Sequence, residues 1–141
     1  MGSGSKSRVG VVIVGHGATA TGLLAAARGI VGDQLDEVVA VDAGRGQTPK
    51  LSATLCRVLS EEDRGRGVLL IVDLLGASPC SCGLREGADH TKVLLSGLNL
   101  AMLLKLANLD REATSALELA VACADSATRS IVVQPHAKEP T

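Results

Sequence analysis

Short apolar runs alternate along the chain with longer segments in which apolar residues recur at helical spacing. The runs, rich in Val, Ile and Leu, have the length of strands and predict five of them, at residues 8–14, 37–41, 68–72, 91–95 and 130–134. The segments between them predict helices at residues 18–31, 49–62, 98–107 and 112–127. A further helix is expected to begin at Ser78–Pro79, where serine can cap the helix and proline can occupy its first position.

This alternation predicts an α/β fold with a doubly wound, mostly parallel sheet. The strands are continuous apolar runs, which is typical of strands covered by helices on both faces. A strand order of 2-1-3-4 is expected for such a sheet. With 141 residues the chain fits one domain, which we expect at residues 8–134. Residues 1–7 then form a flexible tail or tag, and residues 135–141 a polar tail or linker.

The last predicted strand, at residues 130–134, is short and strongly apolar. It contains Ile131, Val132 and Val133 in a row, yet it is only five residues long. So short a strand is not stable alone in water, and an exposed apolar edge favours pairing with another chain. We therefore expect this strand to be exchanged with a second copy in a homodimer.

Composition and charge exclude several classes of function. The chain carries 14 basic and 15 acidic residues and contains no Phe, Tyr or Trp. Without a cationic surface or aromatic stacking platforms, direct nucleic-acid binding is not expected. No apolar run reaches the roughly 18 residues of a membrane span, and no secretory leader is evident, so we expect a cytoplasmic protein with reduced cysteines. No Cys or His residues stand at zinc spacing, and no metal is expected.

Two polar residues follow strands that the order 2-1-3-4 makes neighbours. His16 comes after the first strand and Asp73 after the third. A carboxylate that accepts one imidazole N–H fixes the tautomer, and the other ring nitrogen can then take up a phosphoryl group. His16 is thus a candidate nucleophile, and Asp73 is the group that orients it.

A phosphoryl group on His16 would need hydrogen-bond donors, and loop amides and hydroxyls can provide them. We expect Gly17, Gly76 and Ser78 to bind phosphate, the last at the start of its helix. Asn99 and Met102, near the end of the fourth strand, are expected to line the crevice or a partner surface. No cofactor is required for this chemistry.

The same loop also fits a different class of protein. Residues 15–20 satisfy G-x-G-x-x-A directly after a strand, and Asp42 lies where a dinucleotide site places the acid that binds ribose. A dinucleotide-binding module is therefore an alternative, although it leaves Asp73 and Ser78 without a role.

Three stretches, at residues 11–27, 67–83 and 94–106, resemble the EIIA domain of the mannose/fructose/sorbose family of the bacterial phosphoenolpyruvate:sugar phosphotransferase system. The resemblance implies that His16 is phosphorylated, that Asp73 is its partner and that Ser78 is a phosphate-site hydroxyl. It implies a homodimer whose last strand crosses to the partner's sheet.

By the same resemblance, the protein is a phosphocarrier enzyme with a phosphohistidine intermediate. It would accept phosphate from HPr and pass it to an EIIB domain of a membrane-associated sugar-uptake complex, without inserting into the membrane. Residues 19–21 are also similar to EIIA-like domains of transcriptional activators of sugar operons, where the histidine is a regulatory input.

Overall fold

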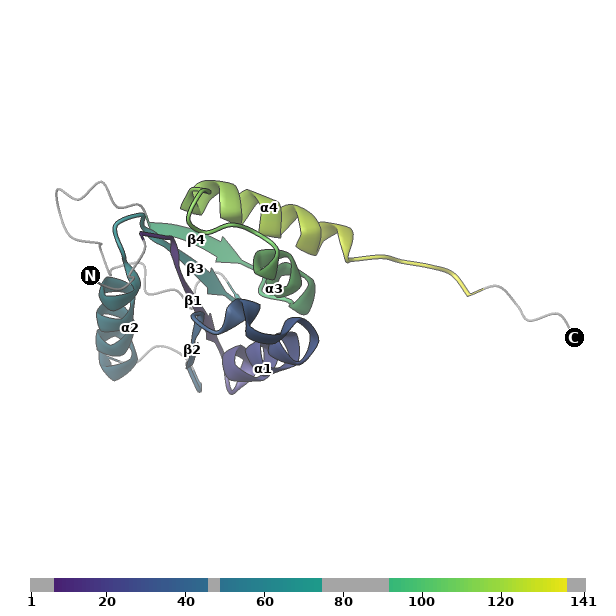
Figure 1. Ribbon diagram of the computed structural model, residues 1–141. Helices are drawn as coiled ribbons and strands as arrows, with labels where there is room; N and C mark the ends of the chain where they lie inside the picture. The colour runs from purple at the N-terminus through teal and green to yellow at the C-terminus, as the bar shows by residue number, and fades with distance from the viewer. Residues whose placement is uncertain (1–6, 46–48, 75–91, 137–141) are drawn as a thin grey trace, which may run out of the picture.

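A parallel sheet of four strands organises the part of the chain that the computed structural model describes, which is residues 7–45, 49–74 and 92–136 (Figure 1). The strands are β1 (Gly10–Gly15), β2 (Val39–Asp42), β3 (Val68–Val72) and β4 (Lys92–Ser96). They lie in the order β2-β1-β3-β4, and each neighbouring pair is parallel. The predicted fold class and strand order are confirmed.

Helices cover both faces of the sheet, which explains the continuous apolar runs of its central strands. On one face lie α1 (Thr19–Val31), the short 3-10 helix η1 (Gly32–Leu35), α3 (Leu100–Ala107) and α4 (Ala116–Arg129). On the other face lies α2 (Pro49–Glu62), well separated from these helices in Figure 1. Every residue of β1 and β3 is buried as a result.

The two faces of β1 enter two separate apolar clusters. Val11 and Ile13 pack with residues of α1, α3 and α4, whereas Val12 and Val14 pack with residues of α2. Both clusters consist of aliphatic side chains, with Met102 and Cys123 the sulfur-containing members among the described residues. Burial of these side chains holds β1 and β3 rigidly side by side, and this fixes the distance between the residues that follow them.

Local caps explain where the helices begin. The predicted helix at 112–127 begins only at Ala116, because Ser115 and Glu118 form a capping box. The predicted helix at 98–107 likewise begins at Leu100, because the side chain of Asn99 caps it. The helix expected at Ser78–Pro79 lies outside the described residues.

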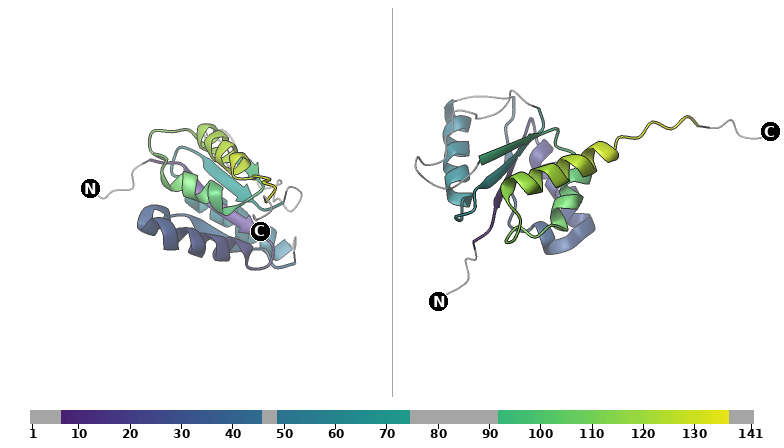
Figure 2. Two further views of the ribbon diagram at one scale, coloured as in Figure 1. Left: turned by 90° about the vertical axis from the view of Figure 1, so that its right-hand side faces the viewer. Right: turned by 90° about the horizontal axis from the view of Figure 1, so that it is seen from above.

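The predicted fifth strand is not present in the described chain. Helix α4 continues to Arg129, and residues 130–136 then extend away from the body of the molecule (Figures 1 and 2). Ile131, Val132 and Val133 are 75%, 63% and 92% exposed. The chain leaves α4 in a direction that reaches no edge of its own sheet, so these residues have no strand to pair with. Exchange with a second copy stays a prediction.

The cysteines differ in state. Cys123 is free and buried on α4, and burial raises the pKa of its thiol to about 11. Cys56 on α2 is disulfide-bonded, so the expectation of four reduced thiols is wrong for this residue.

Candidate functional site

His16 and Asp73 meet at the carboxyl ends of the two central strands. His16 follows β1, and Asp73 follows β3 with its backbone N–H donating to the carbonyl of Val14 at 3.2 Å. The imidazole Nδ1 of His16 lies 3.1 Å from Oδ2 and 3.2 Å from Oδ1 of Asp73. The predicted proximity of these two side chains is confirmed.

Backbone amides fix the Asp73 carboxylate from two sides. The N–H of His16 donates to Oδ2 and the N–H of Leu74 donates to Oδ1, both at 2.8 Å. Partial burial by itself raises the pKa of Asp73, but the hydrogen bonds from His16 and Leu74 outweigh it and hold the pKa below its ordinary value. The carboxylate is therefore ionised and can only accept a hydrogen bond from Nδ1–H.

This pairing determines which nitrogen of His16 can react. A hydrogen bond to an ionised carboxylate requires a proton on Nδ1, which leaves the lone pair of the neutral ring on Nε2. The His16 side chain is 38% exposed, whereas that of Asp73 is 17% exposed. The site thus presents an oriented imidazole at the surface and keeps its carboxylate partner mostly covered.

A tight turn carries His16 from β1 into α1. The His16 carbonyl accepts hydrogen bonds from the N–H of Thr19 at 3.0 Å and from its hydroxyl at 2.6 Å. Gly17 has φ +57°, a conformation that favours glycine. A side chain at Gly15 would come within 3.0 Å of Thr19 Cβ, so glycine there allows α1 to begin close to β1. The glycines on either side of His16 are thus explained by the turn itself.

The expected phosphate-binding residues are only partly described. The N–H of Gly17 donates to the carbonyl of Gly44 at 2.8 Å, so it is already hydrogen-bonded within the protein. The expected contact of Gly17 with phosphate stays a prediction. Gly76 and Ser78 lie outside the described residues, and their expected roles are untested.

Asn99 and Met102 have different positions. A hydrogen bond of 3.0 Å from Leu98 N–H to the Val72 carbonyl brings the start of α3 to the same sheet edge as Asp73. There the half-buried Asn99 accepts the N–H of Met102 at 2.9 Å. Met102 itself is 1% exposed and belongs to the core, so the expectation that it lines a surface is wrong. Its apolar i, i+4 spacing with Leu106 is the signal for this burial.

Asp42 does not stand free for a ribose hydroxyl. Its carboxylate accepts the N–H of Thr21 at 3.1 Å and the Thr21 hydroxyl at 2.6 Å. The sequence pattern G-x-G-x-x-A does not reveal this contact, because Thr21 lies one residue beyond the motif. This contact weakens the dinucleotide alternative, since Asp42, the acid that would bind ribose, already binds α1.

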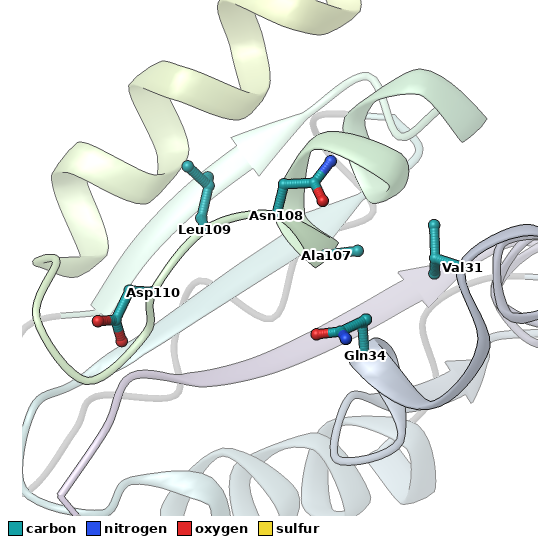
Figure 3. Close-up of a pocket in the computed structure, with 6 residues that line it drawn as sticks. All are labelled: Val31, Gln34, Ala107, Asn108, Leu109 and Asp110. Carbon is teal, nitrogen blue, oxygen red and sulfur yellow. The ribbon is translucent and has the colours of Figure 1, made fainter.

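The described residues form a cavity, but no cluster of metal ligands and no membrane-spanning helix. An open cavity of about 570 Å³ lies between the C-terminal ends of α1 and α3 (Figure 3) and is lined by Val31, Gln34, Ala107, Asn108, Leu109 and Asp110. Within residues 7–45, 49–74 and 92–136, no three His, Cys, Asp or Glu side chains cluster as metal ligands would. No helix in the described part of the chain is long and apolar enough to cross a membrane.

Solved structures of similar fold include two that are described as phosphotransferase-system proteins. An EIIA component from Streptococcus agalactiae is 28% identical, with a TM-score of 0.71 over 89% of this chain and 96% of that one. A mannose/sorbose specific IIA subunit from Enterococcus faecalis is 24% identical, with a TM-score of 0.72 over 94% and 99% of the two chains. A sigma-54 interaction domain protein from Enterococcus faecalis, 20% identical over 89% and 95% of the chains with a TM-score of 0.70, shares the fold.

The comparison of sequences gives the family. None of the curated proteins matches this chain. Residues 10–123 match the family model EIIA-man, described as PTS system fructose IIA component. The match runs from the first residue of β1 into α4 and so includes both His16 and Asp73. The chain therefore belongs to the EIIA-man family of phosphotransferase-system IIA components.

Proposed function

We propose that this protein is a phosphocarrier that accepts a phosphoryl group on Nε2 of His16 and passes it on for sugar uptake. The observation that carries the proposal is the hydrogen bond of His16 Nδ1 to an ionised Asp73, with the ring exposed at the sheet edge. Family membership makes the protein a phosphotransferase-system component, and the paired imidazole supplies the chemistry by which such a component can work.

The transfer step follows from the tautomer. The Nε2 lone pair attacks the phosphorus atom of a donor phosphohistidine, so that a new N–P bond forms while the donor's N–P bond breaks. The donor imidazole leaves with the electron pair of the broken bond. His16 keeps its Nδ1 proton throughout, and the Asp73 carboxylate stabilises the positive charge that develops on the ring. In the transfer to the next carrier, a nucleophile of that carrier attacks the phosphorus atom, and the bond from phosphorus to Nε2 breaks. His16 then regains its Nε2 lone pair.

The partners in the proposal are HPr as donor and an EIIB domain as acceptor. Exposed residues surround His16, among them Gly17, Ala18 and Leu74, and the Leu74 side chain is 63% exposed. A small apolar surface beside a reactive imidazole suits contact with successive protein partners. Gly76 and Ser78 remain proposed hydrogen-bond donors to the phosphoryl group on His16.

The wider setting belongs to the same proposal. We place the domain at residues 8–134, with tails on either side, in the cytoplasm and as a homodimer that exchanges the 130–134 segment. A regulatory domain of a transcriptional activator would use the same phosphorylated His16 and would differ in lacking an EIIB acceptor. Phosphoryl transfer from the loaded protein to an EIIB domain distinguishes the two.

Incubation with phosphoenolpyruvate, enzyme I and HPr, followed by intact-mass measurement, tests the proposal. The wild-type chain should gain one phosphoryl group that is labile in acid and stable in base, as a phosphoramidate is. His16→Ala should gain none, while His136→Ala, a matched change in the tail, should behave as wild type. A label that persists in His16→Ala would place the reaction elsewhere.

A further inference from the structure

Helix α1 begins without a side-chain cap of its own. Its N-cap residue is Ala18, which makes no capping hydrogen bond through its side chain. The first-turn N–H groups of a helix have no intrahelical acceptors, and negative charge is favourable there. Asp42, the last residue of β2, accepts both the N–H and the hydroxyl of Thr21 in this first turn. Asp42 thus supplies from another element the cap that α1 lacks.

The residues that follow Asp42 hold the backbone on both sides of His16. The N–H of Ala43 donates to the carbonyl of Gly15 at 2.7 Å, and the Gly44 carbonyl accepts the N–H of Gly17 at 2.8 Å. Residues 42–44 thus bind the chain at three points around His16. Ala43 binds Gly15 before it, Gly44 binds Gly17 after it, and Asp42 binds Thr21 in the first turn of α1. Together they limit the movement of the turn relative to β1.

The contact of His16 with Asp73 depends on where this turn lies. The backbone N–H and the ring Nδ1 of His16 both bind the Asp73 carboxylate, at 2.8 Å and 3.1 Å. A shift of the turn changes both distances at once. Misplacement of about 1 Å is sufficient to slow a positioned reaction severely.

We propose that Asp42 is a positioning residue for His16, acting through Thr21 and the first turn of α1. Asp42 touches neither His16 nor a transferred group. It holds the turn in the place where Nδ1 meets Asp73, and so keeps the Nε2 lone pair directed outward. The inference rests on the phosphocarrier function proposed above and adds a residue that the phosphohistidine chemistry alone does not require.

Four variants and two matched controls test the route through Thr21. Asp42→Ala, Thr21→Val and their double variant should each lower the maximal rate of transfer from phospho-HPr, by at least about fivefold for Asp42→Ala. The KM for phospho-HPr should change little, and Thr21→Ser should retain the wild-type rate. The double variant should be no slower than Asp42→Ala. The controls Asp125→Ala and Thr128→Val, which remove similar surface hydrogen bonds from α4, should match wild type.

A second measurement separates this inference from the proposed function. The ¹⁵N spectrum of the His16 ring should show the Nδ1–H tautomer in wild type. The spectra are recorded without any phosphate donor, under conditions in which all variants are folded. In Asp42→Ala and Thr21→Val the proportion of this tautomer should fall. If wild type takes up no phosphoryl group, the proposed function fails, and the ring spectra still decide the positioning role. Ring spectra and transfer rates of Asp42→Ala or Thr21→Val equal to those of the controls would overturn it.

Discussion

Asp73 does two tasks at the scale of single residues. Its carboxylate accepts backbone N–H groups from His16 and Leu74, and these contacts keep it ionised and fixed in place. The same carboxylate faces Nδ1 of His16, so the charge that stabilises the loop also orients the imidazole. Substitution of Asp73 should therefore change both the rate of phosphoryl transfer and the stability of the fold, and each effect can be measured on its own.

Substitution of Asp73 by Asn should slow phosphoryl transfer while the protein stays folded. The Asn amide oxygen can still accept a hydrogen bond from Nδ1–H, but it has no charge to stabilise a positive ring. We expect the transfer rate from phospho-HPr to fall by at least about tenfold. Stopped-flow or quenched-flow kinetics measure this rate, and Asp125→Asn on α4 is the matched control. A wild-type rate in Asp73→Asn would reduce Asp73 to a loop-stabilising residue.

The lowered pKa of Asp73 also predicts how stability depends on pH. Because the folded-state pKa lies below the ordinary value of 3.8, ionised Asp73 contributes stability that is complete above that value. The contribution is lost as pH falls through the lower folded-state pKa. Urea unfolding between about pH 2 and 6 should therefore show a smaller acid loss of unfolding free energy in Asp73→Asn than in wild type. Parallel curves for the two proteins would contradict this.

At the scale of elements, the turn from β1 to α1 shows what the sequence can and cannot predict. The strand–turn–helix order was predictable because apolar runs and glycines mark its boundaries. The nearness of His16 to Asp73 was predictable because carboxyl ends of neighbouring parallel strands share one edge. The hydrogen bonds of Gly17 and Asp42 were not, since they involve Asp42 at the end of β2 and Gly44 just after it, and no local pattern relates these residues to the turn.

The same element yields a prediction against the dinucleotide alternative. The Gly17 amide and the Asp42 carboxylate, which such a site uses for pyrophosphate and ribose, are occupied by Gly44 and Thr21. Calorimetric titration with NAD and with NADP should give no measurable heat of binding. Micromolar affinity for either cofactor would show that the turn opens to accept it.

At the scale of the whole molecule, the described segment after α4 is not packed against the rest of its own chain. Its Ile131, Val132 and Val133 side chains are exposed, although the same residues predicted a buried strand. Local β-propensity alone does not make a strand here, because a strand forms only where a sheet edge is available. The burial of Met102, in contrast, was predictable from its i, i+4 spacing with Leu106, which places both side chains on the helix face that meets the core.

If the proposed homodimer exchanges this segment, removal of residues 130–141 should leave a monomer. Burial of a large aliphatic side chain is worth about 1.5–3 kcal/mol, so three of them form a substantial part of an exchanged interface. Sedimentation velocity at low micromolar concentration measures the change. A chain that ends at Gln134 lacks only the polar tail and should remain dimeric. A dimer that persists without residues 130–141 would place the interface elsewhere.

The central claim is that the phosphoryl group is carried on Nε2 of His16 while Nδ1 keeps its proton on Asp73. The most direct measurement is ¹⁵N NMR of the histidine-labelled protein after phosphorylation by phosphoenolpyruvate, enzyme I and HPr. The account predicts phosphorus coupling to Nε2 of His16 and a protonated Nδ1. Phosphorus on Nδ1, on another residue, or on none would contradict it.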